Sequence, residues 1–319
     1  MVGYDSKATV QLSHKEHAVA AALSSAVSRA LWQPLDVLKI RFQLQVEPIR
    51  RSSSNSKYRS LYQASSSILK EEGWKALWKG HVPAQILSVG YGVAQYTSFE
   101  FFTKCAWHLL PEKYSNDLYR PVLHTVCGGL SGCLASLCIH PVDVLRTRFI
   151  AQGEPKVYTS IYDAIGKIYK HEGIRGFYKG LVPAITQVGP QMGLQFGLYA
   201  LCLEIISMIK DTPSTSMPGA TESLFSGTAA GVVAKLIIYP FDIVKKRLQI
   251  QGFEQARQSF GSVRHYSGLF NCLFIIIKEE TVLGLYKGLS PSLLKAGVVA
   301  GTNLCLYEQI CKLLYVLKS

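Results

Sequence analysis

The chain has 319 residues, of which 48% are hydrophobic and only 17% are charged, below the roughly 25% usual for soluble domains. Lys and Arg outnumber Asp and Glu by 34 to 21, which gives a formal net charge of +13. High apolarity with few charges excludes a disordered chain and argues against an ordinary soluble enzyme. The long apolar stretches also differ from the short alternating segments of an outer-membrane β-barrel.

Six apolar segments follow one another along the chain, each near the ~20 residues that a helix needs to cross a bilayer. They cover residues 18–38, 82–99, 122–139, 181–203, 223–244 and 289–306. The polar linkers after the first, third and fifth segments carry most of the basic excess, and the other linkers are nearly neutral. We therefore predict an all-α membrane protein with six spanning helices and both termini on the side opposite the basic linkers.

The N-terminal segment and the cysteines indicate how the protein is targeted and whether its thiols are free. The first 17 residues contain no apolar core of a secretory signal peptide, so we expect any targeting signal to be internal. The eight cysteines form no Cys-x-x-Cys pair and lie mostly in apolar runs, which favours free thiols over disulfides or metal ligands. We therefore predict no metal site.

Two sequence blocks occur three times in the same order. The first block reads Pro34-Leu-Asp36-Val-Leu-Lys39-Ile-Arg41, Pro141-Val-Asp143-Val-Leu-Arg146-Thr-Arg148 and Pro240-Phe-Asp242-Ile-Val-Lys245-Lys-Arg247. The second reads Glu72-Gly73…Trp78-Lys79-Gly80, Glu172-Gly173…Tyr178-Lys179-Gly180 and Glu280-Thr281…Tyr286-Lys287-Gly288. The recurrence predicts three structural repeats, over residues 1–120, 121–219 and 220–319.

Together the two blocks resemble the signature of the mitochondrial carrier family, Pro-x-[Asp/Glu]-x-x-[Lys/Arg]-x-[Lys/Arg] followed by [Asp/Glu]-Gly-x4-aromatic-[Lys/Arg]-Gly. The resemblance covers nearly the whole chain, and Thr281 in place of glycine is its one clear departure. It implies a pseudo-threefold bundle of six tilted helices in the mitochondrial inner membrane. It also implies three short matrix helices near residues 61–70, 160–170 and 269–278.

The acid and the first base of each signature are three residues apart, so they share a helix face. Charges at the edge of a bilayer need partners, and in a threefold ring each acid can pair with the base of the next helix. The expected pairs are Asp36 with Arg146, Asp143 with Lys245, and Asp242 with Lys39. The resemblance makes these pairs a gate on the matrix side; the alternative is pairing within one helix at the interface.

Two further features concern the gates. Gln43 and Gln249 match the glutamines that brace this gate in the family, whereas Ile150 occupies the third position. The family's second gate, [Phe/Tyr]-[Asp/Glu]-x-x-[Lys/Arg] on the even helices, is kept only in part. Its remaining acids are Glu100 and Glu308, with Thr103 and Cys311 at the positions of the bases and Ala200 at that of the third acid. We expect a weak cytoplasmic gate, with Lys104 or Lys312 as substitute partners.

Three cations, Arg29, Lys235 and Lys295, interrupt the apolar segments near their middle and have no acid close by in the sequence. A long side chain can reach the lipid headgroups from near the end of a span, but these positions are too deep for that to be easy. We therefore predict an anion site, most simply for phosphate groups.

Polar side chains repeat at a spacing of four on the even helices. The spacing keeps each set on one helical face, and the residues are Gln187, Gln191, Gln195, Tyr91, Gln95 and Asn303. A polar stripe in an apolar span faces a cavity or a neighbouring helix, and we predict a cavity. Hydrogen bonds between helices are the alternative. The glycine pairs Gly128/Gly132 and Gly227/Gly231 predict close helix packing.

Stretches that include residues beyond the signature are similar to the members of this family that carry thiamine pyrophosphate; they are residues 1–5, 39–45, 78–88, 140–148, 151–158, 252–257 and 289–295. The resemblance implies import of this phosphorylated substrate into the matrix by exchange with nucleotides. In this interpretation the cations hold the diphosphate, Tyr91 stacks on a ring and the glutamines bond the aminopyrimidine. An adenine nucleotide or coenzyme A fits these groups nearly as well and stays the alternative substrate.

Other classes find less support. The sequence contains no nucleotide-binding glycine loop and no set of His and Cys at metal-ligand spacing, so we expect a carrier without a cofactor and not an enzyme. A soluble helical-repeat scaffold is the second alternative. The basic residues are spread beside apolar spans, so we expect membrane lipids and no nucleic acid as partners, and a monomer.

Overall fold

The computed structural model describes residues 13–49, 56–109, 120–209, 219–253 and 264–318, in which helices are the only regular secondary structure besides short 3₁₀ turns. The long helices are α1 (His14–Leu44), α3 (His81–Leu109), α4 (Arg120–Ala151), α6 (Leu181–Thr186) continued by α7 (Val188–Ile209), α8 (Ala220–Gln249) and α10 (Leu289–Lys318). The short helices are α2 (Leu61–Glu72), α5 (Ile161–Glu172) and α9 (Leu269–Glu280), where the resemblance implied three matrix helices.

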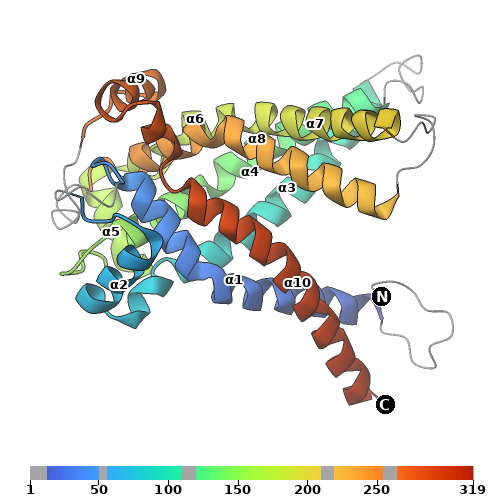
Figure 1. Ribbon diagram of the computed structural model, residues 1–319, viewed down its shortest axis with the longest axis horizontal. Helices are drawn as coiled ribbons and strands as arrows, with labels where there is room; N and C mark the ends of the chain where they lie inside the picture. The colour runs from blue at the N-terminus through green and yellow to red at the C-terminus, as the bar shows by residue number, and fades with distance from the viewer. Residues whose placement is uncertain (1–12, 50–55, 110–119, 210–218, 254–263, 319) are drawn as a thin grey trace.

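The six long elements form a bundle in which neighbouring repeats share a tight helix pair. Helix α3 packs against α4, α7 against α8, and α10 against α1. The first, third and fifth long helices, which are α1, α4 and α8, also contact one another, and we call them the odd helices. The second, fourth and sixth, which are α3, α6–α7 and α10, are the even helices. Figure 1 shows α2, α5 and α9 at one end of the bundle, with the start of α1 and the end of α10 at the other. The predicted pseudo-threefold architecture is confirmed.

The surface of the bundle suits a lipid environment. Three stretches, Leu123–Ala151, Ile174–Ile209 and Thr221–Gln249, are long and apolar enough to cross a membrane. Helices α1, α3 and α10 have 31, 29 and 30 residues, so they are long enough as well, but polar side chains lower their hydropathy. Exposed apolar side chains nevertheless follow one face of α1 at every fourth position, namely Val19, Leu23, Val27 and Leu31.

Buried arginines join each repeat to the next. The last arginine of each signature pairs with the glutamate of its own repeat, with one Nη2–Oε2 distance of 2.8 Å in all three cases. Its Nε atom donates to a carbonyl near the end of the following odd helix, at 3.1–3.2 Å. These sets are Arg41 with Glu72 and Ile150, Arg148 with Glu172 and Gln249, and Arg247 with Glu280 and Gln43. They satisfy helix-end carbonyls that otherwise have no partner.

Two of these glutamates, Glu72 and Glu172, are held in the charged form. Burial alone would raise the pKa of Glu72, but Arg41 and Lys79 outweigh burial and keep that pKa below its ordinary value. Glu172 has a lowered pKa for the same reason, with Arg148 and Lys179 as its partners. The repeated lysine thus adds a second cation to each buried glutamate, as Lys287 does for Glu280.

Glycines at the starts of the even helices allow close contact between repeats. A Cβ atom at Gly180 would lie 2.8 Å from the carbonyl oxygen of Lys245, and one at Gly288 would lie 2.7 Å from that of Lys39. Both glycines also have positive φ, at 79° and 77°. A side chain at either position would separate an even helix from the odd helix of the next repeat.

The predicted packing role of the other glycines holds at one position only. A Cβ at Gly132 would lie 2.9 Å from Val188 Cγ1, so this glycine does allow α4 and α7 to approach. A Cβ at Gly128, Gly227 or Gly231 would meet nothing within 4 Å. The close packing predicted for these three is wrong in this structure, because no neighbouring atom comes within contact distance of the added Cβ.

Thr281 keeps the backbone turn that glycine makes in the other repeats. Its φ of 66° and ψ of 175° match the positive φ of Gly73 and Gly173. For a residue with a side chain this region costs about 1–3 kcal/mol, partly offset by the extra entropy that a glycine loses on folding. We expect Thr281→Gly to raise the free energy of unfolding by about 1 kcal/mol, measured by thermal unfolding in detergent.

The reverse change provides the control. A Cβ at Gly173 would meet nothing within 4 Å, so Gly173→Thr tests the backbone alone and should lower stability by a similar amount. A Thr281→Gly protein that unfolds at the same temperature as the wild type, or below it, would contradict the strain at Thr281.

Candidate functional site

A cavity of about 530 Å³ lies inside the bundle. Six of the residues predicted to bind substrate line it: Tyr91, Gln95, Gln187, Gln191, Gln195 and Lys235. Five residues of the predicted matrix gate also line it: Lys39, Asp143, Arg146, Asp242 and Lys245. We call this space the floor cavity. The predicted residues Arg29, Lys295 and Asn303 are not among its lining residues.

Ion pairs between the odd helices close the floor cavity on the side of the short helices. Arg146 Nη2 lies 2.7 Å from Asp36 Oδ2, and Lys245 Nζ lies 2.8 Å from Asp143 Oδ2. Lys39 Nζ lies 3.7 Å from the carboxylate of Asp242. Each pair joins two different helices, as the threefold ring requires, and none is the intrahelical pair of the alternative interpretation.

The three joints of this ring are unequal. At the α4–α8 joint, Asp143 also accepts from Lys246 Nζ and from Gln249 Nε2, both at 2.8 Å. Gln249 therefore lies where a brace is expected. At the α8–α1 joint, Gln43 Nε2 instead donates to the hydroxyl of Tyr239 at 3.2 Å. The predicted contact of Gln43 with its gate pair is absent among the described residues, because the amide group of Gln43 donates to the Tyr239 hydroxyl instead.

Two of the three cations that were predicted to bind an anion form ion pairs with carboxylates of the ring. Lys295 Nζ lies 2.7 Å from each carboxylate oxygen of Asp36, and Lys235 forms an ion pair with Asp242. The prediction that these lysines have no acid nearby is therefore wrong. Lys235 is seven residues before Asp242, two turns along one helix face, and Lys295 approaches Asp36 because α10 packs against α1. For Arg29 the described part of the chain offers no ion pair, although Arg146 and Asp36 lie within electrostatic range.

The charges around the ring do not cancel. The carboxylates are Asp36, Asp143 and Asp242, and the cations are Lys39, Arg146, Lys245, Lys246, Lys235, Lys295 and Arg29. The described side chains thus give the ring and its surroundings a formal excess of four positive charges, and those that line the floor cavity itself give an excess of three. A hollow with low-dielectric walls and one sign of charge concentrates ligands of the opposite sign. The floor cavity is suited to a multiply charged anion.

The floor cavity is also lined by amide groups. Gln187 lies between α6 and α7, where the helix is interrupted by a single turn residue. Pro190 explains the interruption, because it has no N–H to donate to the carbonyl of Thr186. Gln187 Oε1 is buried without a partner among the described residues, and so is Asn303 Oδ1 on α10. An unpaired buried acceptor is costly, so a ligand donor at Gln187 would relieve it.

The residues before the signature prolines have a function that the sequence analysis missed. Their side chains bond the carbonyl of the repeated lysine in the same repeat, over 2.9–3.2 Å. The pairs are Gln33 with Lys79, His140 with Lys179, and Tyr239 with Lys287. Three different side chains make the same contact, so the recurring signal is the position and not the residue type.

The end opposite the ring has few charged contacts between helices. Glu100 pairs with Lys104 at 2.8 Å within α3, and both side chains are exposed. Glu308 forms no ion pair in the part of the chain that the structure describes. The contact between α1 and α10 at this end is neutral, with His17 Nδ1 2.9 Å from the hydroxyl of Tyr307. Among the described residues, the inter-helix ion pairs that close the cavity lie at the matrix-helix end.

Six long helices in three repeats, around a cavity closed at one end by a ring of ion pairs, define a membrane carrier. The model of the family described as "Mitochondrial carrier protein" matches residues 10–108, 118–210 and 217–317. The chain belongs to this family, and it is a multi-pass protein of the mitochondrial inner membrane.

Curated relatives are similar over the whole chain. The chain is 47% identical to the mitochondrial thiamine pyrophosphate carrier of Bos taurus, over 100% of this chain and 99% of the relative. It is also 47% identical to the human protein of that name, over 99% and 97%. The mitochondrial thiamine pyrophosphate carrier 1 of Coccidioides immitis (strain RS) is 37% identical over 92% and 91%.

Proposed function

We propose that the chain imports thiamine pyrophosphate into the mitochondrial matrix in exchange for nucleotides. The observation that carries the proposal is the excess of three positive charges among the residues that line the floor cavity, which neutral amides line as well. The names of the relatives and the family membership support the same substrate. The substrate passes unaltered and no cofactor takes part. One chain holds all three repeats, so the transporting unit is a monomer surrounded by lipid.

Lys235 and Lys295 connect the substrate to the gate. Each now bonds a gate carboxylate, and a diphosphate arriving at the floor competes with that carboxylate for the same ammonium group. When the lysines turn to the diphosphate, Asp242 and Asp36 each lose one of their two cationic partners. Substrate binding thereby weakens the ring whose opening admits the substrate to the matrix. Arg29 adds a third cation to this phosphate site.

The polar wall supplies recognition of the rest of the molecule. Gln187 accepts a hydrogen bond from the amino group of the pyrimidine at its unpaired Oε1. Gln191 and Gln195 continue the row of amides along α7, and Tyr91 and Gln95 face it from α3. Asn303 of α10 does not line the floor cavity in this structure, so it contacts the substrate only after α10 moves. These groups position the substrate by hydrogen bonds, which discriminate against molecules that lack the matching donors.

Transport follows from alternating closure of the two ends. The matrix gate opens once the diphosphate of the substrate has replaced the gate carboxylates as the partner of Lys235 and Lys295. This gate consists of Asp36, Asp143, Asp242, Lys39, Arg146 and Lys245, with Gln249 as brace. At the other end Glu100 and Glu308 are the remaining acids of the cytoplasmic gate, and they form a weaker closure. The state that is closed to the cytoplasm is therefore less stable than the state of this structure, which is closed on the matrix side. This difference favours a fast return from the first state to the second.

A thermal-shift series tests the substrate. A ligand that binds the folded state alone stabilises it by RT ln(1 + [L]/Kd). We expect the melting temperature of the purified carrier to rise most with thiamine pyrophosphate, less with thiamine monophosphate, and not with thiamine at equal concentration. An adenine nucleotide or coenzyme A that stabilises the protein more than thiamine pyrophosphate would replace the proposed substrate with the alternative one.

A further inference from the structure

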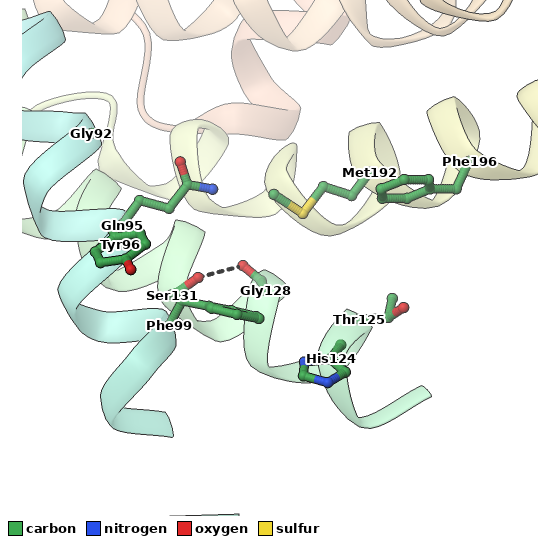
Figure 2. A pocket seen from close by; sticks show the side chains of 10 residues that line it. All are labelled: Gly92, Gln95, Tyr96, Phe99, His124, Thr125, Gly128, Ser131, Met192 and Phe196. Atoms are coloured by element: carbon green, nitrogen blue, oxygen red, sulfur yellow. Dashed lines mark hydrogen bonds between the residues drawn. The ribbon is translucent and has the colours of Figure 1, made fainter. Parts of the chain in front are cut away.

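A second cavity of about 530 Å³ lies toward the end of the bundle that carries the termini, between α3, α4 and α7. None of its described lining residues is Lys, Arg, Asp or Glu. Figure 2 shows one hydrogen bond among these side chains, from Ser131 to the carbonyl oxygen of Gly128, and this bond lies within α4. These residues provide no ion pair that holds this end together, so the ring at the opposite end largely determines how easily the carrier changes state.

The α8–α1 joint is the weakest of the three joints of this ring. The ion pair of Lys39 with Asp242 spans 3.7 Å, whereas the pairs at the other two joints span 2.7 and 2.8 Å. At the α4–α8 joint, Gln249 also donates to Asp143 at 2.8 Å and accepts from Lys246 at 3.0 Å. Among the described residues no such amide braces the α8–α1 joint, although a glutamine is available there.

This glutamine is Gln43, which occupies the same position of its repeat as Gln249. Each follows its signature proline by nine residues, and both side chains are fully buried. Gln43 nevertheless donates to the hydroxyl of Tyr239 at 3.2 Å, and its own Oε1 has no partner among the described residues. A hydroxyl is a neutral acceptor, so this bond is weaker than the charge-assisted bond that Gln249 makes to a carboxylate.

Tyr239 is fixed in place by contacts of both its hydroxyl and its ring. The side chain is fully buried, and the hydroxyl donates to the carbonyl oxygen of Lys287 at 3.0 Å. The Nζ atoms of Lys39 and Lys235 each lie 5.9 Å from the centroid of its ring. At this distance an aromatic ring attracts a cation. The tyrosine therefore contacts both lysines that pair with Asp242, in addition to the glutamine of the same joint.

The other two repeats do not reproduce this arrangement. The residue equivalent to Tyr239 is Gln33 in the first repeat and His140 in the second. His140 bonds a backbone carbonyl at 2.9 Å, and Gln249 remains on the ring. At the α1–α4 joint the brace position holds Ile150, so there is no amide to divert. Diversion of a brace is thus particular to the α8–α1 joint.

We propose that Tyr239 is a positioning residue of the transport cycle: its hydroxyl keeps Gln43 away from the ring and makes the α8–α1 joint the first to open. The inference rests on the proposed function, in which the diphosphate replaces Asp242 as the partner of Lys235. Asp242 then retains Lys39 at 3.7 Å, without a brace. Helices α1 and α8 can therefore separate at this joint while the braced α4–α8 joint stays closed.

The first test is Tyr239→Phe, which removes the hydroxyl and keeps the ring. Gln43 can then donate to Asp242, as Gln249 donates to Asp143, so the gate becomes harder to open. We expect the Vmax of thiamine pyrophosphate uptake into nucleotide-loaded liposomes to fall about 10-fold, which corresponds to about 1.4 kcal/mol in the barrier, without a raised KM. The melting temperature of the ligand-free carrier should rise, because the variant stabilises the closed ring.

A second substitution, Gln43→Met, separates this role from a merely structural one. The double variant Tyr239→Phe/Gln43→Met has no amide to place on the ring, so it should recover the wild-type Vmax and lose the added thermal stability. A defect caused by the lost contact with the Lys287 carbonyl would not be rescued in this way. The matched control is Gln249→Met, at the position where the glutamine does brace, and it should lower the melting temperature more than Gln43→Met alone.

The outcomes separate this inference from the proposed function. If Tyr239→Phe transports thiamine pyrophosphate as fast as the wild type, or if the double variant stays slow, Tyr239 does not control the gate and the transported substrate stands. If the wild type takes up no thiamine pyrophosphate, the proposed function is wrong. The melting temperatures then still test the inference, because a Tyr239→Phe carrier that is no more stable than the wild type overturns it.

Discussion

Lys295→Ala should reduce the uptake of thiamine pyrophosphate at least 10-fold. The substitution removes one of the charge-assisted contacts available to the diphosphate, each worth about 1.5–3 kcal/mol. It also leaves Asp36 with Arg146 as its partner, so the ring of ion pairs loses one contact. The measurement is initial uptake of labelled substrate into liposomes over a range of concentrations, which should show a raised KM.

Two further variants separate binding from gating. Asp36→Asn weakens the gate but keeps Lys295 for the substrate, so it should lower the thermal stability without raising the KM as strongly. Lys278→Ala removes an exposed cation of α9 that belongs to neither gate and does not line the floor cavity, and its uptake should equal that of the wild type. A Lys295→Ala carrier with an unchanged KM would remove this lysine from the phosphate site.

Glu280→Gln should destabilise the protein by about 3–5 kcal/mol. Arg247 and Glu280 are both almost fully buried, and the neutral amide would leave Arg247 and Lys287 without a counter-charge. Breaking a buried pair by removing one partner has a cost of this size. Arg247 also donates to the carbonyls of Gln43 and Gln45, so its displacement would loosen the contact of the third repeat with the first. Thermal unfolding in detergent measures the loss.

The neighbouring glutamate provides a matched control. Glu279 pairs with Arg264 at 3.0 Å, and both side chains are partly exposed. Exposed pairs contribute about 0–1 kcal/mol, so Glu279→Gln should change the stability little. If both variants unfold at the same temperature, the buried pair does not hold the repeats together.

The sequence predicts the architecture well because each repeat carries its own local signals. The short helices expected near residues 61–70, 160–170 and 269–278 occupy Leu61–Glu72, Ile161–Glu172 and Leu269–Glu280. The ring pairs follow from the spacing of acid and base within each signature together with threefold order. Both inferences need only periodicity and repetition, which a single chain displays.

The site is harder to predict because its contacts depend on distant packing. Lys295 meets Asp36 through the α10–α1 interface, which no local pattern encodes. Lys235 and Asp242 are two turns apart on α8, so their pairing was visible in the sequence and was missed. Gln43 matches the brace position in the sequence, yet its amide group donates a hydrogen bond to the hydroxyl of Tyr239.

Uptake of labelled thiamine pyrophosphate by liposomes containing the purified carrier tests the central claim most directly. We expect saturable uptake into vesicles loaded with a nucleotide, little uptake into empty vesicles, and inhibition by inorganic pyrophosphate, which shares only the diphosphate. Absence of uptake under all loading conditions, or uptake that excess pyrophosphate does not reduce, would contradict a carrier whose positively charged floor binds the diphosphate of its substrate.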